Sequence, residues 1–287
     1  MKRLVLVHGM RQEGKDPVEL RRSWEDALVA KWNALGLSRP EYEIEMPFYG
    51  DVLAKLTGEL RSGSGGVVAR GGSTSVSDFE IAAMRQIADR FGVGETSIRG
   101  EMSTEVVTRG PANWEWVQAI GRALERKIPG LGTWALEFVE QVDAYLGRPH
   151  VKKAVDAIVT PALAHSHRES VVVAHSLGTI VGYRILRNDV GLGSIPLFAT
   201  LGSPLGIRAV TDRITPPKLA IPAKVGKWVN GTDERDYVAL YAKLDASNFV
   251  DGIENWDDVH NREEDAHFIG DYLSDERVSK AIHKALR

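Results

Sequence analysis

Short apolar runs alternate along the chain with longer stretches in which apolar residues recur every three or four positions. The runs 4–7, 171–173 and 195–201 are almost continuously apolar, which is typical of parallel strands that are buried on both faces. The stretch 42–48 alternates between apolar and polar residues, and 224–230 is a further apolar run. Each of these five segments is expected to be a strand.

The segments between these runs carry the helical period. Helical spacing of apolar residues marks 20–35, 151–162, 177–185 and 278–286. Asp16 and Pro17 suit the start of the first helix, Gly36 suits its end, and Ser274 is the expected cap of the last helix. Strand, helix and strand in this order predict a right-handed parallel unit, and so an α/β fold.

Residues 50–148 break this alternation. The segment 58–77 is rich in Gly and Ser and is expected to be a loop, and helical patterns follow at 84–91, 117–128 and 138–146. About a hundred residues are too many for an ordinary connection within a compact domain. The region is therefore either an inserted helical cap over an active site or a second helical layer with no role in binding.

Composition restricts the function classes. The chain has 287 residues, a net charge of −3 and no cysteine, so it offers neither a basic field for nucleic acid nor a disulfide or thiolate metal site. The apolar run 4–7 is too short for a signal peptide, and no apolar run is long enough for a transmembrane helix. A cytoplasmic protein with one domain over 1–287 is expected.

The segment that most clearly indicates a catalytic residue is V-V-V-A-H-S-L-G at 171–178. A strand, a sharp turn and a helix follow one another there, with Ser176 at the turn. Such a turn exposes the serine hydroxyl beyond the end of the sheet. The Leu177 amide at the helix N-terminus then points towards negative charge that develops beside this hydroxyl. The alternative is that Ser176 only caps the helix, since serine is a favoured N-cap residue.

The strand–A-H-S-L-G–helix arrangement resembles the nucleophile elbow of lipases and esterases in the α/β-hydrolase superfamily, with Ala174 where Gly is commonest. The resemblance covers residues 1–50 and 150–287. It implies a three-layer α/β-hydrolase fold with a mostly parallel central sheet and with 50–148 as the cap insertion. His8-Gly9 resembles the start of the oxyanion loop, which implies that the amides of Met10 and Leu177 are the oxyanion donors.

Two further phrases resemble this family. Asp236-Tyr237-Val238-Ala239 is similar to the phrase that carries the acid, and the histidine in Asp265-Ala266-His267 is similar to the one that opens the last loop. The resemblance implies catalytic residues Ser176, Asp236 and His267, in the α/β-hydrolase order. Asp233 is an alternative acid, followed by Asp245 and Asp251, and His260 is the competing histidine. Ser203, in the G-S-P-L phrase that shapes the family's pocket wall, lacks the helix that a nucleophile elbow needs.

This set of residues has a clear chemical rationale. A serine hydroxyl needs a base, and the histidine base needs an acceptor that fixes its tautomer. The resemblance implies hydrolysis of a carboxylic ester, from a small-molecule or lipid substrate, through an acyl-enzyme on Ser176 and without a cofactor. A serine peptidase or amidase with the same residues is one alternative, and an inactive binding or signalling module is another. The sequence contains no metal-binding H-E-x-x-H motif, so no metal is expected.

Overall fold

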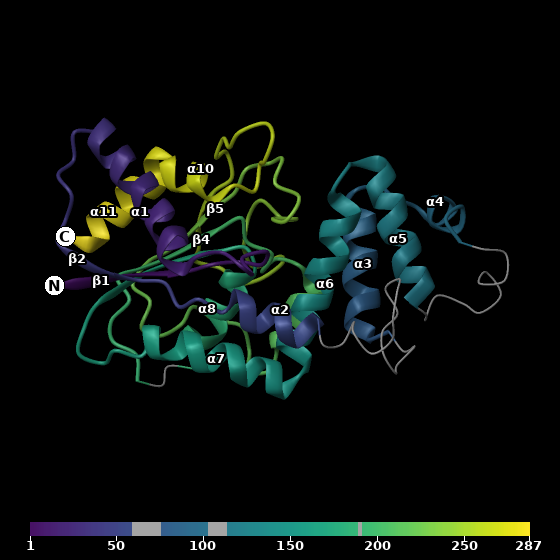
Figure 1. The fold of residues 1–287 in the computed structure, drawn as a ribbon, viewed down its shortest axis with the longest axis horizontal. Helices are drawn as coiled ribbons and strands as arrows, with labels where there is room; N and C mark the ends of the chain where they lie inside the picture. Colours follow the sequence, from purple (N-terminus) through teal and green to yellow (C-terminus); the bar gives the residue numbers. More distant parts are fainter. Residues whose placement is uncertain (59–75, 103–113, 189–190) are drawn as a thin grey trace. The chain divides into compact units, whose positions relative to one another are not determined.

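The computed structural model describes residues 1–58, 76–102, 114–188 and 191–287 (Figure 1). In these ranges six strands form one sheet in the order β2-β1-β3-β4-β5-β6, and every neighbouring pair runs parallel. The strands are β1 (Lys2–Val7), β2 (Tyr42–Glu45), β3 (Ser170–His175), β4 (Leu197–Leu201), β5 (Trp228–Gly231) and β6 (Glu254–Trp256). The predicted α/β class with a mostly parallel sheet is confirmed.

The apolar patterns explain where the strands lie in the sheet. All residues of β3 and β4 are buried, as the continuous apolar runs predict, and these strands are central. Strand β2 alternates between half-buried and exposed residues, because it lies at one edge. Both β2 and β4 are shorter than predicted, since Pro47 and Pro196 lack the N–H that a paired strand donates.

Helices cover both faces of the sheet (Figure 1). On one face lie α1 (Pro17–Ala34), α10 (Ile269–Ser274) and α11 (Glu276–Leu286), and on the other lie α7 (Pro149–Leu163) and α8 (Leu177–Arg187). The core of the first face joins Trp32 of α1 and Tyr272 of α10 to Leu6 and Val173 of the sheet. Packing of this kind buries apolar area at roughly 25 cal/mol per Å² and holds the strand ends in place.

Side chains at the helix ends explain where two of the helices begin. Asp16 caps α1 as predicted, because its Oδ1 accepts hydrogen bonds from the Val18 and Glu19 amides at 2.7 and 3.0 Å. The predicted cap of the last helix is wrong. Ser274 ends α10, and the carboxylate of Asp275 caps α11 instead.

The chain divides into two compact units. The sheet unit comprises Met1–Asp51, Ala154–Gly206 and Ile214–Arg287, and the helical unit comprises Val52–Lys153 and Ile207–Arg213. The helical unit contains α3 (Asp78–Arg90), α4 (Glu95–Arg99), α5 (Trp114–Lys127), α6 (Leu131–Gly147), most of α2 (Gly50–Gly58) and most of α9 (Arg208–Ile214). Helices α3, α5 and α6 are the three that the sequence predicts. Most of the predicted Gly- and Ser-rich loop, 59–75, lies outside the described residues.

Helix α9 was not predicted, and it follows β4 in the chain although it belongs to the helical unit. The Ala209 amide donates to Gln86 Oε1 of α3 at 3.2 Å, and Arg213 donates to Asp143 of α6 at 3.0 Å. These contacts join two segments that lie more than sixty residues apart, which no local pattern reveals. Among the described helices, none combines the length and the apolar character that crossing a bilayer requires.

Candidate active site

Ser176 lies between the end of β3 and the start of α8 in a strained backbone conformation, with φ 55° and ψ −131°. Positive φ is uncommon for a residue that has a Cβ, and a conformation of this kind costs of order 1–3 kcal/mol. The Ser176 side chain makes no capping hydrogen bond to α8, which removes the interpretation of this serine as a simple helix cap. Its Oγ is buried and has no hydrogen-bond partner within the described ranges.

The serine lies where the strand order of the sheet reverses. The chain leaves β1 towards β2 on one side, and β3 leads to β4 on the other, so the carboxyl ends of β1 and β3 meet between the two halves. Ligands bind at such switch points in open α/β sheets. The loop after β1 lies directly against the serine, because a Cβ built on Gly9 would lie 2.6 Å from the Ser176 Cβ.

His8 fixes the loop that follows β1. Its Nδ1 lies 2.8 Å from the Gly9 carbonyl oxygen and its Nε2 accepts a hydrogen bond from the Tyr49 amide at 3.1 Å. A ring that accepts at Nε2 must be neutral and carry its proton on Nδ1. Burial lowers the pKa of His8 to about 4, so the ring stays neutral at pH 7.

Two backbone amides adjoin the contact between Gly9 and Ser176 in the chain. The Leu177 amide is the first of α8, and the Met10 amide follows Gly9 in the loop after β1. In the described part of the chain, neither N–H is among the backbone donors that bond another backbone group in turns, loops and caps. Both residues are buried, and a buried donor interacts with a nearby charge more strongly than a donor in water does.

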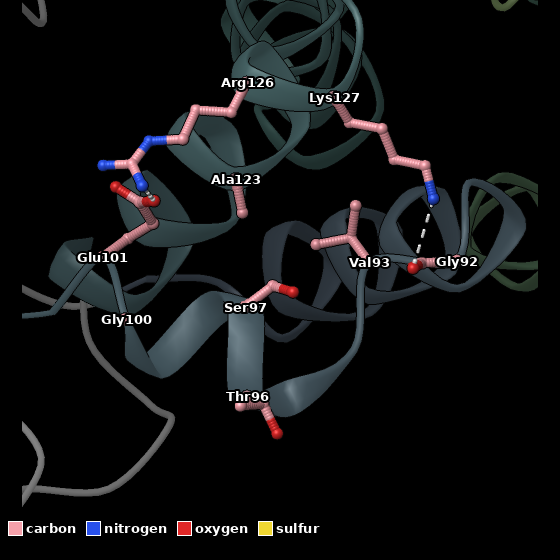
Figure 2. Close-up of a pocket in the computed structure, with 9 residues that line it drawn as sticks. All are labelled: Gly92, Val93, Thr96, Ser97, Gly100, Glu101, Ala123, Arg126 and Lys127. Carbon is pink, nitrogen blue, oxygen red and sulfur yellow. Dashed lines mark hydrogen bonds and ion pairs between the residues drawn. The ribbon is translucent and has the colours of Figure 1, made fainter.

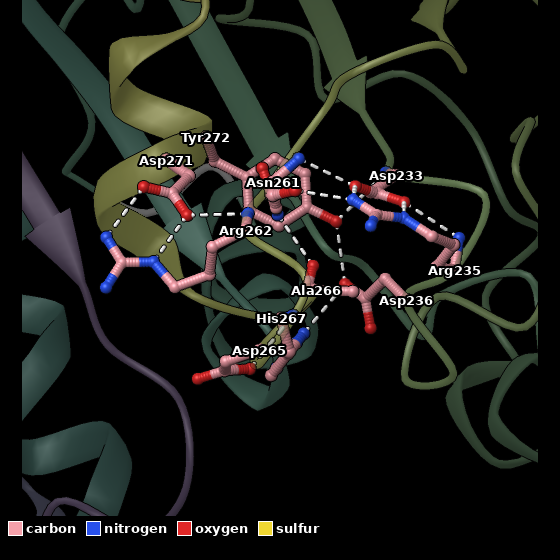
Figure 3. A network of polar contacts seen from close by, with 10 residues as sticks. All are labelled: Asp233, Arg235, Asp236, Asn261, Arg262, Asp265, Ala266, His267, Asp271 and Tyr272. Atoms are coloured by element: carbon pink, nitrogen blue, oxygen red, sulfur yellow. Dashed lines mark hydrogen bonds and ion pairs between the residues drawn. The ribbon is translucent and has the colours of Figure 1, made fainter.

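Asp236 and His267 form a hydrogen-bonded pair (Figure 3). The Nδ1 of His267 lies 2.8 Å from Asp236 Oδ2, and the same oxygen accepts from the Tyr272 hydroxyl at 2.7 Å. The other oxygen accepts from the Val238 amide at 2.8 Å. A carboxylate can only accept, so Nδ1 of His267 carries a proton, and Nε2 is the nitrogen that can accept one in the neutral ring.

Asp233 has different partners. Its carboxylate accepts from the Arg235 side chain at 2.7 Å and from the Asn261 amide at 2.7 Å (Figure 3). Burial raises the pKa of Asp233, but the hydrogen bonds from Arg235 and then Asn261 outweigh it and lower that pKa below its usual value. Asp233 therefore ties the loop after β5 to the loop before His267. The side chain of Asp245 bonds Ser247 instead, and His267 pairs with Asp236 rather than with Asp245 or Asp251.

Gly202 lies against the Asp236–His267 pair at the end of β4. Its φ is +55°, and a Cβ at this position would lie 2.7 Å from Asp236 Oδ2 and 2.9 Å from His267 Nδ1. Only glycine leaves room for the carboxylate and the imidazole to meet. The position lies in the G-S-P-L phrase, but its contact with the acid and the base was not predicted.

His175 is a second residue that the sequence did not assign to the site. Its Nε2 donates to the His267 carbonyl oxygen at 3.0 Å, and the two rings lie 4.3 Å apart between centroids. Burial, and secondly the neighbouring His267, lower the pKa of His175 well below its ordinary value. The residue that precedes Ser176 thus holds the backbone of His267. By contrast, His165 and His167, which lie between α7 and β3, are exposed.

The described structure brings Asp236 to His267 and His267 to His175, next to Ser176, but it does not form a hydrogen bond between Ser176 and His267. Hydrogen bonds of this kind often tighten only when substrate is bound. No cluster of three or more His, Cys, Asp or Glu residues suited to a metal ion occurs in the described ranges. Comparison with protein-family models, with curated proteins and with solved structures finds no match for this chain.

The helical unit has a hollow of its own, of about 390 Å³, between α4 and α5 (Figure 2). Its charged groups already have partners inside the protein. Glu101 pairs with Arg126 at 2.8 Å and with Arg122, and Lys127 donates to the Gly92 carbonyl at 3.3 Å. The groups that suit catalysis therefore gather at the carboxyl edge of the sheet rather than in this hollow.

Proposed function

We propose that this protein is a serine hydrolase that cleaves a carboxylic ester through an acyl-enzyme on Ser176. One observation carries the proposal: the hydrogen-bonded Asp236–His267 pair lies at the same sheet edge as a serine with φ 55° that does not cap its helix. A base that is oriented by a carboxylate, next to a nucleophile on a strained turn, is the arrangement that activates a serine hydroxyl.

Each group has one role in the proposed reaction. The Ser176 oxygen attacks the ester carbonyl carbon while Nε2 of His267 takes the hydroxyl proton. The amides of Met10 and Leu177 bind the oxyanion that forms. The carbonyl then re-forms, the bond to the alkoxy group breaks, and His267 returns the proton to the departing alcohol. Water, activated by His267, releases the acid from Ser176 by the same steps.

Asp236 orients the base throughout this cycle. Its Oδ2 accepts a hydrogen bond from the Nδ1–H of His267, with 2.8 Å between the two heavy atoms, and so Nε2 is the nitrogen that exchanges protons in the proposed reaction. The negative charge of Asp236 stabilises the imidazolium that forms. Tyr272 and Val238 hold the carboxylate in place through hydrogen bonds of 2.7 and 2.8 Å. The acid is therefore fixed before substrate arrives.

The proposal includes the finer assignment of the fold. A parallel sheet with helices on both faces and the serine at the strand-order reversal is compatible with an α/β-hydrolase fold. Within the same proposal, residues 50–148 act as a cap that selects the substrate, which is a small-molecule or lipid ester. The proposed reaction needs no cofactor, and a cytoplasmic location belongs to the same proposal.

Covalent labelling tests the proposal. The full chain is treated with a fluorophosphonate probe, and the modified residue is mapped by peptide mass spectrometry. We expect modification of Ser176 in the folded protein, and its loss after unfolding and in Ser176→Ala. Removal of the nucleophile costs several orders of magnitude in rate, so near-normal turnover in Ser176→Ala, or labelling at another serine, would overturn the proposal.

A substrate panel then separates ester from amide hydrolysis. The enzyme is assayed with acyl esters of increasing chain length and with peptide amides, with Ser176→Ala as the blank for each. We expect turnover of esters. Faster cleavage of the amides would show a peptidase or amidase that uses the same residues. A chain that is neither labelled nor active on any of these substrates would be an inactive binding or signalling module.

A further inference from the structure

A chain of hydroxyl groups leads from Ser203 to the peptide bond that follows Ser176. The Leu205 amide donates to Ser203 Oγ at 3.3 Å, and Ser203 Oγ lies 2.9 Å from Thr179 Oγ1. Thr179 Oγ1 in turn donates to the Ser176 carbonyl oxygen at 2.7 Å. Both hydroxyl-bearing residues are buried. We call Ser203 and Thr179 the hydroxyl relay.

The direction of the relay follows from its ends. A carbonyl oxygen only accepts, so the single proton of the Thr179 hydroxyl points at the Ser176 carbonyl. Thr179 Oγ1 must then accept from Ser203, whose own oxygen accepts from the Leu205 amide. Every donor in the relay has one acceptor, so the whole chain has a single arrangement. Buried networks of this kind make a local structure rigid.

By holding the Ser176 carbonyl, the hydroxyl relay also fixes the direction of the Leu177 N–H. The peptide between Ser176 and Leu177 is planar, and in the trans form its N–H points away from its C=O. Fixing the Ser176 oxygen therefore also fixes the direction of the Leu177 N–H. The Thr179 amide bonds the same oxygen at 2.9 Å, so the oxygen is held from two directions.

We propose that Thr179 and Ser203 are positioning residues that aim the Leu177 amide at the oxyanion, an inference that rests on the proposed function. The strained conformation of Ser176 makes such support necessary, since a residue at φ 55° relaxes unless its surroundings hold it. An oxyanion donor contributes only when it is fixed in advance at about 3 Å from the developing charge. The Ser203 of the G-S-P-L phrase thereby acquires a role that is not nucleophilic.

The test substitutes the first hydroxyl. Thr179→Val keeps the shape of the side chain but removes its hydrogen bonds to Ser176 and Ser203. We expect the second-order rate of fluorophosphonate labelling at Ser176 to fall about 10-fold, less than the 10²- to 10³-fold that follows loss of an entire oxyanion donor. Thr179→Ser restores the hydroxyl and should restore most of the rate.

Thr200→Val is the matched control. Thr200 is a buried residue of β4 whose Oγ1 bonds Asn230 Oδ1 and Trp228 Nε1, both at 3.0 Å, and it belongs to no part of the proposed machinery. The same atoms are lost in both variants, so their melting temperatures should fall by similar amounts. Only Thr179→Val should slow labelling.

Two further measurements distinguish a misdirected Leu177 N–H from a general loosening of the site. The pH dependence of labelling should keep its midpoint in Thr179→Val, because the Thr179 hydroxyl bonds Ser176 and Ser203 rather than His267 or Asp236. Ser203→Ala should slow labelling less than Thr179→Val does. The double variant, Thr179→Val with Ser203→Ala, should label no more slowly than Thr179→Val alone, because residues of one network do not act additively. A shifted midpoint, or additive losses, would contradict the relay.

The outcomes distinguish this inference from the function on which it rests. Wild-type labelling at Ser176 together with equal rates in Thr179→Val and Thr200→Val would overturn the relay and leave the serine hydrolase standing. A wild-type protein that is not labelled at Ser176 would overturn both. If Thr179→Val fails to fold, the rates of Ser203→Ala and Thr179→Ser decide, and a Ser203→Ala variant as fast as wild type would overturn the relay.

Discussion

The imidazole rings of His175 and His267 lie against each other, with centroids 4.3 Å apart and planes inclined by 32°. The Nε2 of His175 donates to the backbone carbonyl of His267 at 3.0 Å. Because His175 immediately precedes Ser176, this contact links the proposed nucleophile turn to the loop of the proposed base. Burial lowers the pKa of His175 and keeps its ring neutral, so it adds no charge beside the imidazolium that His267 would form.

Substitution of His175 tests this link. His175→Phe keeps a ring against His267 but removes the donor, whereas His175→Gln keeps an N–H donor and removes the ring. Loss of the hydrogen bond leaves a buried carbonyl without a partner, which costs about 1–3 kcal/mol. We expect His175→Phe to slow labelling of Ser176 about 10-fold and to shift its pH midpoint, since the base is then less well held.

His175→Gln serves as the comparison for this experiment. It should label faster than His175→Phe, because the donor to the His267 carbonyl is retained. Rates for both variants equal to wild type would show that His175 only fills space. A faster His175→Phe variant would show that the ring contact matters and the hydrogen bond does not.

The second prediction concerns the two aspartates of the loop after β5. In Asp236→Asn an amide faces Nδ1 of His267 and stabilises the wrong tautomer, a change that can cost about four orders of magnitude in turnover. We expect Asp236→Asn to lose most ester hydrolysis. Asp233→Asn weakens the bonds to Arg235 and Asn261 and should chiefly lower the melting temperature. The reverse pattern, measured by turnover and thermal unfolding, would assign the role of the acid to Asp233.

Contacts between neighbours in the sequence could be predicted, whereas contacts across the fold could not. The strand–turn–helix around Ser176 and the Asp16 cap of α1 follow from residues within a few positions of one another. Asp236 and His267 could be named through a resemblance, but their contact joins residues 31 positions apart. Tyr272, which donates to Asp236 across 36 positions, carries no local signal of that role.

The missed elements have similar causes. Strand β6 has only three residues, none of them fully buried, so it lacks the apolar run that marks a strand. Helix α9 belongs to the helical unit because of side chains on α3 and α6 that lie far away in the sequence. Ser274 and Asp275 are adjacent and both are favoured caps, so the choice between them depends on where α10 ends.

The third prediction is that Gly202→Ala separates activity from folding. The added methyl would lie 2.7 Å from Asp236 Oδ2 and 2.9 Å from His267 Nδ1, so the hydrogen bond between them must lengthen or break. Alanine in the left-handed region adds about 1–2 kcal/mol of strain. We expect at least a 100-fold loss of turnover, since misplacement by about 1 Å costs this much. Circular dichroism should show an unchanged fold, and a fully active variant would refute the geometry.

The last prediction is that acid destabilises the protein partly through His8. This ring is neutral when folded because burial lowers its pKa to about 4, whereas the unfolded chain has a value of 6.5. Between these values the unfolded state binds a proton that the folded state does not, so the free energy of unfolding falls as the pH falls from 6.5 towards 4. The loss for this one group is about 3 kcal/mol in total, at 1.36 kcal/mol per pH unit.

Denaturant unfolding of wild type and His8→Asn between pH 7 and pH 4 measures this contribution. The variant should be less stable at pH 7, because the Tyr49 amide loses its acceptor at Nε2. It should also lose less stability on acidification, because no imidazole is left to take up a proton when it unfolds. The carboxylates titrate in both proteins, so the difference between the two curves isolates His8. If the free energy of unfolding fell equally with pH in the two proteins, His8 would take up its proton in the folded state as readily as in the unfolded state. The assignment of a neutral His8 ring that bonds Gly9 and Tyr49 would then be wrong.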